Sequence, residues 1–210
     1  MMIWILYEPF NLFFMLLCIL TNPIVVLFSS KEGELPGILH YWQTWDDSLN
    51  PRFYILEHVP KCFRYDYDKH FEEYWGQTDK LKKLNKQRCF ARVKDGNFTF
   101  KEKIQLYITR VMWLYRNISY GFSFYVLGRM FNSAKMTLVK EKKHYDGSST
   151  KVWADTSKSI LTRPWCIKSD ARISKHLRVK IYMGWKIDNS SLDLNCQHMI
   201  AHCIVPRYVK

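Results

Sequence analysis

The sequence predicts an α+β protein in which an N-terminal transmembrane or hydrophobic helix precedes a small helical region and an antiparallel sheet. Three observations support this fold class. Residues 9–30 contain no charged side chain, residues 99–116 carry a helix signature, and the residues after Asn117 alternate as strands do. Because helices come first and strands follow, the order favours α+β over an alternating α/β fold.

The amino-terminal segment is long enough to cross a membrane as a helix. A helix rises 1.5 Å per residue, so about 20 residues span the roughly 30 Å hydrocarbon core. Proline at position 23 predicts a kink or break, so a hydrophobic hairpin and a buried core helix stay open as alternatives. Aromatic rings favour the membrane interface. The residues expected to anchor the chain are Trp4, Tyr7, Phe13, Leu16, Leu20 and Pro23.

Charge separates this segment from the remainder of the 210 residues. The chain has a formal net charge of +13, yet residues 1–30 contain no Lys or Arg and a single acid, Glu8. We therefore expect a membrane anchor at 1–30, a polar linker at 31–37 and a basic α+β domain at 38–210. Basic residues follow the segment and none precedes it, which predicts that the basic domain faces the cytoplasm.

The basic domain is expected to begin with helices. An aromatic-rich stretch from residue 38 either lies in the lipid headgroup zone or packs on the core. Residues 66–76 and 78–93 read as two helices. Thr99 and Glu102 form a capping box that introduces a third helix, because each side chain satisfies the other's free backbone donor. The apolar stripe expected on that helix is Ile104, Ile108, Val111, Met112 and Tyr115.

The last third is expected to form strands. Asp146 and Gly147 predict the turn of a hairpin between residues 137–145 and 150–155. Residues 175–187 alternate apolar and basic side chains, which predicts a strand with one buried and one solvated face. A final strand is expected within residues 196–209.

The sequence carries no motif that names a reaction. It lacks a P-loop, the G-x-G-x-x-G and G-x-S-x-G patterns and zinc-ribbon cysteine spacing. The acids Asp46 and Asp47 are typical of a turn. We therefore expect no enzymatic activity, no catalytic residue and no cofactor. Weak metal-ligand candidates cluster near the carboxyl end, where four ligands in eight residues cannot easily surround one ion: Cys196, His198, His202 and Cys203.

A run of basic side chains is the candidate for contact with lipid or phosphate. Beside a membrane anchor, anionic lipid is favoured over nucleic acid as the partner, because each base near the cytoplasmic leaflet contributes about 1 kcal/mol. A solvated basic face is the alternative. The residues are Lys80, Lys82, Lys83, Lys86, Arg88 and Arg92.

Three stretches resemble a family of small proteins of tailed bacteriophages. They are WQTWDDSL at 42–49, WLYRNISYGF at 113–122 and GWK at 184–186, in the order and spacing of that family. Residues 45, 47 and 118 depart from its usual pattern. The family has no activity that can be carried over; the resemblance implies a phage origin. The motif residues are Trp42, Asp46, Trp113, Arg116, Asn117, Tyr120, Gly121 and Trp185.

These observations predict a non-enzymatic, membrane-anchored phage protein that acts at the host inner membrane. Its expected partners are membrane lipid and an unidentified phage or host protein, in superinfection exclusion, lysis control or host takeover. The alternative is a virion component whose hydrophobic segment packs in the particle or enters the membrane during DNA delivery.

Overall fold

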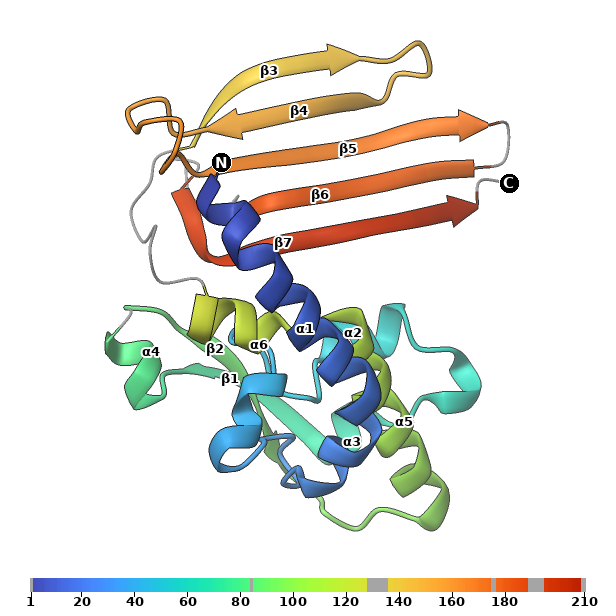
Figure 1. Ribbon diagram of the computed structural model, residues 1–210. Coiled ribbons are helices and arrows are strands. Elements are labelled where there is room, and N and C mark those ends of the chain that lie inside the picture. Colours follow the sequence, from blue (N-terminus) through green and yellow to red (C-terminus); the bar gives the residue numbers. More distant parts are fainter. Residues whose placement is uncertain (1, 84, 128–135, 175–176, 189–194, 209–210) are drawn as a thin grey trace. The chain divides into compact units, whose positions relative to one another are not determined.

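The computed structural model describes residues 2–83, 85–127, 136–174, 177–188 and 195–208, and it confirms the mixed α+β class (Figure 1). The chain forms two compact units. Unit 1 comprises residues 1–12 and 123–210, and unit 2 comprises residues 13–122. The predicted division into an anchor, a linker and a basic domain stays a prediction.

Unit 1 is built on a five-stranded antiparallel sheet with the strand order β3-β4-β5-β6-β7 (Figure 1). The hairpin at Asp146 and Gly147 is confirmed, and Gly147 has a positive φ of 79° that suits glycine. The unit also contains the start of α1 and the π-helical turn η4 (Ser123–Leu127). The strands are β3 (Thr137–Lys143), β4 (Ser149–Ala154), β5 (Trp165–Ser174), β6 (Leu177–Asp188) and β7 (Asn195–Tyr208).

The strand β6 does not have the predicted division into one buried and one solvated face. Leu177 is exposed, and the side chains from Arg178 to Met183 are half-buried on both faces of the strand. Full burial begins only at Gly184 and Trp185. β6 lies between β5 and β7, and side chains of these neighbouring strands flank its own side chains on each face of the sheet, which covers them in part.

Unit 2 contains the remaining helices and a two-stranded antiparallel sheet. One apolar cluster gathers the end of α1, Leu49, Tyr54 and the helix α5. The elements are the rest of α1 (Met2–Val25), η1 (Val26–Phe28), η2 (Gly37–Trp42), α2 (Arg52–Glu57), η3 (Lys61–Phe63), α3 (Tyr67–His70), β1 (Phe71–Gly76), α4 (Asp79–Lys83), β2 (Arg88–Val93), α5 (Phe100–Arg116) and α6 (Tyr120–Phe122).

Two predicted helices prove to be mostly strand. Only residues 67–70 and 79–83 are helical, and the residues that follow each short helix pair as β1 and β2. Phe71 of β1 and Ala91 of β2 are buried in one apolar cluster with Tyr65 and Tyr67. Burial of these side chains favours the extended pairing over the local helical pattern, because tertiary packing outweighs a weak intrinsic propensity.

The helix α5 begins where the sequence predicts, but it buries a different face. The capping box is present, with the Glu102 N–H donating to Thr99 Oγ1 and the Thr99 N–H donating to Glu102 Oε2. Ile104 and Tyr115 of the predicted apolar stripe are 45% and 39% exposed. The buried residues are Gln105, Thr109, Arg110, Trp113 and Leu114.

Candidate membrane-contact surface

One face of α1 packs on the protein along a seam with the three-and-four spacing of helix packing. In unit 1 the ring of Trp4 lies 5.2 Å from that of Trp165, and Ser123 Oγ donates to Asn11 Oδ1 at 3.1 Å. In unit 2 Phe14 stacks on Phe122 at 4.4 Å. The seam consists of Trp4, Tyr7, Asn11, Phe14, Cys18, Asn22 and Val25, each buried or half-buried.

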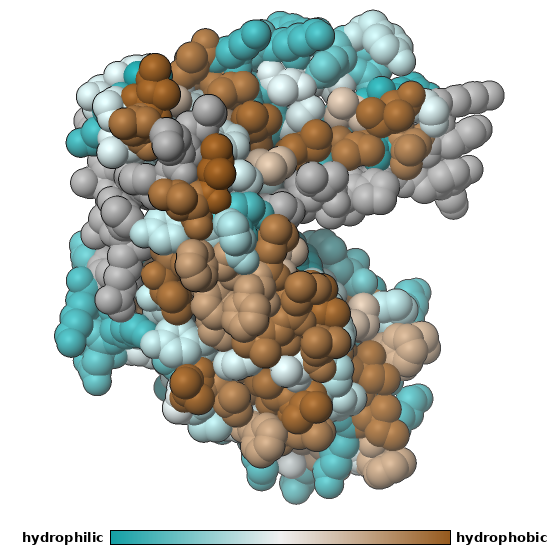
Figure 2. Space-filling view, in the orientation of Figure 1, coloured by the Kyte–Doolittle hydropathy of each residue, from teal (hydrophilic) through white to brown (hydrophobic). Residues whose placement is uncertain are grey.

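The opposite face of α1 and η1 is exposed and wholly apolar. Its side chains are 58–76% exposed, and Figure 2 shows brown side chains gathered over α1 on the visible face. Such a stripe is unusual for a helix surrounded by water, which keeps polar residues on its outer face. We call it the outer stripe: Leu6, Phe10, Phe13, Leu16, Leu20, Ile24 and Leu27.

The polarity of α1 is therefore reversed relative to a surface helix of a soluble protein. Polar side chains face inward, as Asn11 and Asn22 do, and Trp42 Nε1 donates to Thr21 Oγ1 at 2.8 Å. Residues 4–28 are long and apolar enough to cross a membrane, and 28% of the most apolar window is buried within the protein. Length, composition and reversed polarity together make the outer stripe the candidate surface for contact with lipid.

The helix α1 runs through Pro23 without the predicted break (Figure 1). Proline has no N–H to donate to the carbonyl four residues earlier, which is that of Ile19. Tyr115 of α5 supplies the missing donor, and its hydroxyl lies 2.9 Å from the Ile19 oxygen. Tyr107 donates to the carbonyl of Pro23 itself at 3.0 Å. These two tyrosines satisfy backbone groups that a membrane interior would leave without partners.

Arg110 fastens the residues just after η1 to α5. Its guanidinium donates to Asn50 Oδ1, to Ser29 Oγ and to the carbonyl of Lys31, at 2.7–2.8 Å. Burial lowers the pKa of Arg110 to about 10, opposed by the charges of Tyr65, Glu32 and Glu34. The contacts are to neutral groups, so the arginine orders the loop through its fork of donors. The predicted linker is thus bonded into unit 2.

The first two family motifs meet in unit 2. A Cβ atom on Gly121 would lie 2.3 Å from the carbonyl oxygens of Tyr41 and Gln43, so the motifs pack with no room for a side chain. The Trp42 ring lies 4.8 Å from that of Phe122. Gly121 does not have a positive φ; in this segment the positive φ belongs to Ser119, at 56°. The role of Gly121 is close approach.

The first motif forms a buried polar loop. The backbone N–H of Leu35 donates to Gln43 Oε1 at 3.0 Å, and Gln43 Nε2 donates to the carbonyl of Asp47 at 3.2 Å. Glu34 forms an ion pair with the buried Arg88. Burial, together with the charges of Asp46 and Glu73, raises the pKa of Asp47 to about 8. Such a network specifies a fold when its members are satisfied.

The other motif positions also contact the protein. Asn117 ends α5 as its capping residue, and both its N–H and its Nδ2 donate to the carbonyl of Trp113. Arg116 lies 5.3 Å from the Trp113 ring centre.

In unit 1, Gly184 approaches the Trp165 carbonyl as closely as Gly121 approaches its neighbours, and Trp185 is 1% exposed. The carbonyl of Asp46 accepts from Cys89 N–H, and Tyr120 N–H donates to Asn117.

The predicted anchor residues divide between the two faces of α1. Phe13, Leu16 and Leu20 lie on the outer stripe. The prediction that Trp4 lies at the membrane interface is wrong, because its ring is buried against Trp165. Tyr7 likewise packs edge-on against Trp185, with ring centres 6.4 Å apart. Aromatic burial on the sheet outweighs the interfacial preference that composition suggested. Pro23 is half-buried.

The predicted basic run is not one helix. Lys80, Lys82 and Lys83 lie on α4, Lys86 follows it, and Arg88 and Arg92 lie on β2. Arg88 is corrected as a lipid contact, because it is 5% exposed and bound to Glu34. Arg92 and Lys82 are exposed but pair with Glu72 and Asp79. Lys86 lies 5.0 Å from the ring centre of Trp45, and Lys80 lies 4.7 Å from that of Tyr41.

The predicted metal candidates stay untested. Cys196, His198, His202 and Cys203 fall on β7, and their side chains lie outside the described residues. Among the residues that are described, no group of three or more His, Cys, Asp or Glu could hold a metal ion.

The seam residues Asn11, Cys18 and Asn22 were missed by sequence reasoning. Their spacing of seven and four residues inside a charge-free run is the signal that could have found them.

The fold and the reversed helix define a mixed α+β protein with one apolar helix long enough to cross a membrane. Residues 1–210 match the model of DUF7338, a family of unknown function, and the chain belongs to this family. No curated protein and no solved structure matches the chain.

Proposed function

We propose that this is a non-enzymatic, membrane-anchored bacteriophage protein that acts at the host inner membrane through lipid and protein contacts. The outer stripe of α1 carries the proposal. Seven apolar side chains are exposed there, and the polar side chains of the helix face the protein instead. Burying this stripe in hydrocarbon is favourable by about 25 cal/mol per Å² of apolar surface, whereas contact with water is not.

Lipid is the occupant that fits the outer stripe best. A protein partner would be expected to find some polar rim on such a surface, and none of the seven stripe residues is polar. The chain outside residues 1–30 carries 32 basic residues, which favour an anionic membrane surface. The bacteriophage origin rests on the three motifs, and the cytoplasmic side rests on the basic residues that follow the anchor.

Vesicle flotation of the full chain tests the membrane contact. Leu16→Glu with Leu20→Glu places two charges on the outer stripe, and each charge costs about 2.5 kcal/mol or more in hydrocarbon on insertion scales. We expect vesicle partitioning to fall at least tenfold. The matched control is Leu161→Glu with Ile173→Glu, which alters two exposed apolar side chains of unit 1 outside α1. Recovery of the wild-type chain as a soluble monomer without detergent would contradict the proposal.

The same exposed stripe also suits packing against other subunits, which favours a virion component as the second candidate. Mass spectrometry of purified particles separates the two. Stoichiometric presence in the particle supports the virion function, and absence from particles together with recovery in the inner-membrane fraction supports the first proposal.

A further inference from the structure

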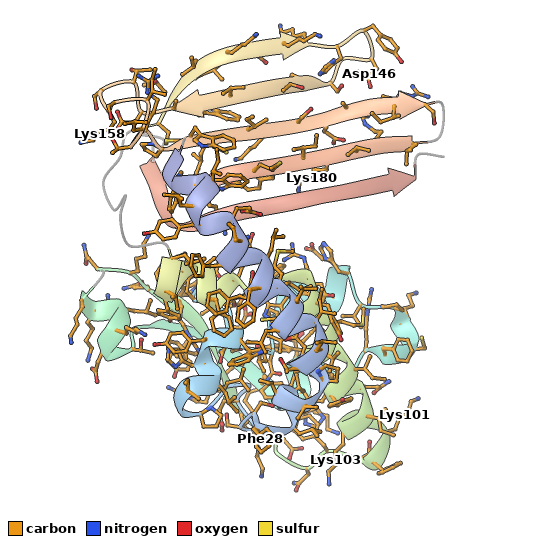
Figure 3. All side chains as sticks on the ribbon, viewed as in Figure 1. Phe28, Lys101, Lys103, Asp146, Lys158 and Lys180 are labelled. Carbon is orange, nitrogen blue, oxygen red and sulfur yellow. The ribbon has the colours of Figure 1, made fainter. Side chains whose placement is uncertain are left out.

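The five-stranded sheet of unit 1 carries a pocket that the membrane contact does not use. The pocket has a volume of about 410 Å³ and is lined by residues of β4, β5 and β6. Strand register explains which side chains converge there, because Lys151 pairs with Lys168, and Lys168 with Tyr182. Lys180, labelled in Figure 3, lies midway along β6, opposite Asp170 of β5.

The charge of this pocket is positive. Lys151, Lys168 and Lys180 line it together with one acid, Asp170, and Lys151 is paired with Glu141 of β3 at 3.4 Å. Asp170 lies 3.4 Å from Arg178, so part of its charge is already neutralised. Burial lowers the pKa of Lys168, and the charges of Lys180 and Lys186 lower it further. Crowded ammonium groups of this kind favour the binding of an anion, which relieves their mutual repulsion.

Two aromatic rings stand beside the central lysine. Lys168 Nζ lies 5.5 Å from the ring centre of Trp153 and 4.9 Å from that of Tyr182. Both rings line the pocket, as does the hydroxyl-bearing Ser149. The ammonium groups of lysines bind phosphate as point charges. Aromatic rings on an open sheet stack against the flat bases of nucleotides. The volume lies within the range of small-molecule sites, about 300–1,000 Å³.

We propose that this pocket binds a nucleotide, with Lys168 and Lys180 on the phosphate and with Trp153 and Tyr182 against the base. The nucleotide is either free or one unit of a single-stranded nucleic acid that crosses the sheet. The proposal is independent of the membrane contact, which lies on α1. A lipid phosphate would use the lysines but carries no flat base to place against the two rings.

Fluorescence anisotropy with a labelled 12-nucleotide oligothymidylate tests the proposal on the full chain in neutral detergent at 0.15 M salt. We expect Lys168→Met with Lys180→Met to weaken binding at least tenfold. The matched control, Lys101→Met with Lys158→Met, removes the same charge at two exposed positions (Figure 3) and should weaken binding less than twofold. Equal losses in both variants, or no binding by the wild-type chain, would overturn the proposal.

Two further measurements keep the proposal testable if the double variant unfolds. Ultraviolet crosslinking of the oligonucleotide to the wild-type chain should label peptides that contain Trp153 or Tyr182, and labels confined to other peptides would overturn it. Competition identifies the source of the phosphate. Displacement by thymidine monophosphate indicates a free nucleotide, and retention of the oligonucleotide indicates the polymer. If only vesicles of phosphatidylglycerol displaced the oligonucleotide, the ligand of the pocket would be a lipid headgroup, and the proposal would be overturned.

Discussion

At the scale of single residues, Gly121 occupies a position with no room for a side chain. Its Cα lies so close to the carbonyls of Tyr41 and Gln43 that a methyl group would meet both oxygens at 2.3 Å. Backbone atoms cannot move aside as a flexible side chain can. This contact joins two segments about 80 residues apart in the chain.

We predict that Gly121→Ala destabilises the protein by more than about 2 kcal/mol, because the helix α6 must move away from η2. Urea unfolding in detergent, followed by circular dichroism, measures the change. Gly96→Ala is the control, since its nearest neighbour is the flexible end of Lys31 at 3.3 Å. A loss in Gly121→Ala as small as that of the control would show that the close approach is not required.

Asp47 predicts a dependence of stability on pH. Its pKa is raised to about 8 by burial and by the charges of Asp46 and Glu73, against an ordinary value near 4. The folded state therefore holds a proton that the unfolded state has released, and the free energy of unfolding falls as pH rises from about 4 to 8. Above pH 8 the carboxyl is ionised in both states, and its contribution to the slope ends.

We predict that Asp47→Asn removes about one proton from the pH dependence of the free energy of unfolding. The stability of the variant, measured against that of the wild-type chain, should therefore be higher at pH 8 than at pH 5. The asparagine keeps an oxygen that can accept from the Ser48 N–H. Unfolding at a series of pH values measures the slope. Asp79→Asn, at an exposed carboxylate of α4, should leave it unchanged. An unaltered slope in Asp47→Asn would contradict a protonated Asp47 in the folded state.

At the scale of elements, α1 depends on side chains that come from α5. Proline would ordinarily kink a helix, since it removes one backbone hydrogen bond and crowds the preceding turn. Here the carbonyl of Ile19 accepts from Tyr115, and the helix continues for two residues beyond Pro23 before it tightens into η1. The break predicted from the sequence is absent, and the hydrogen bond that Pro23 cannot make is replaced by one from a distant tyrosine.

A double-mutant cycle tests this compensation. Tyr115→Phe should destabilise the wild-type chain by about 1 kcal/mol, because the Ile19 carbonyl loses its donor. In Pro23→Ala the new backbone N–H can donate to that carbonyl, so the same substitution should cost less, with a coupling of about 1 kcal/mol. Tyr145→Phe serves as the control, since this tyrosine is 92% exposed. Additive effects of the two changes would show that Tyr115 does not replace the missing donor.

At the scale of the whole molecule, membrane binding is expected to have an apolar and an electrostatic part. The outer stripe supplies the apolar part, and the net charge of +13 supplies the electrostatic part. The two respond differently to salt, because the Debye length falls from about 10 Å at 0.1 M to about 3 Å at 1 M while apolar burial is not screened.

We predict that 1 M salt lowers binding to phosphatidylglycerol vesicles to the level found with phosphatidylcholine vesicles. Binding to phosphatidylcholine vesicles should not change with salt. Flotation at both salt concentrations measures this. If salt abolished binding to both kinds of vesicle, the outer stripe would not enter the membrane. If salt changed neither, the basic charge would not contact lipid.

The sequence by itself determined the fold class, the apolar helix, the capping box of α5, the hairpin at Gly147 and the strands β6 and β7. Each of these rests on a local signal: a charge-free run, a cap, a turn dipeptide or alternation along one segment. Each of these signals involves residues that are close together in the sequence, so it can be recognised without a structure.

Only the tertiary structure decided which faces these elements bury. Trp4 packs on Trp165, and Arg88 is buried beside Glu34. The residues of β1 and β2 have a helical sequence pattern but pair with each other as strands. The pocket of unit 1 exists only because three strands set Lys151, Lys168 and Lys180 side by side. Such choices depend on contacts between residues far apart in the chain, and their free energies outweigh the local preferences that a sequence displays.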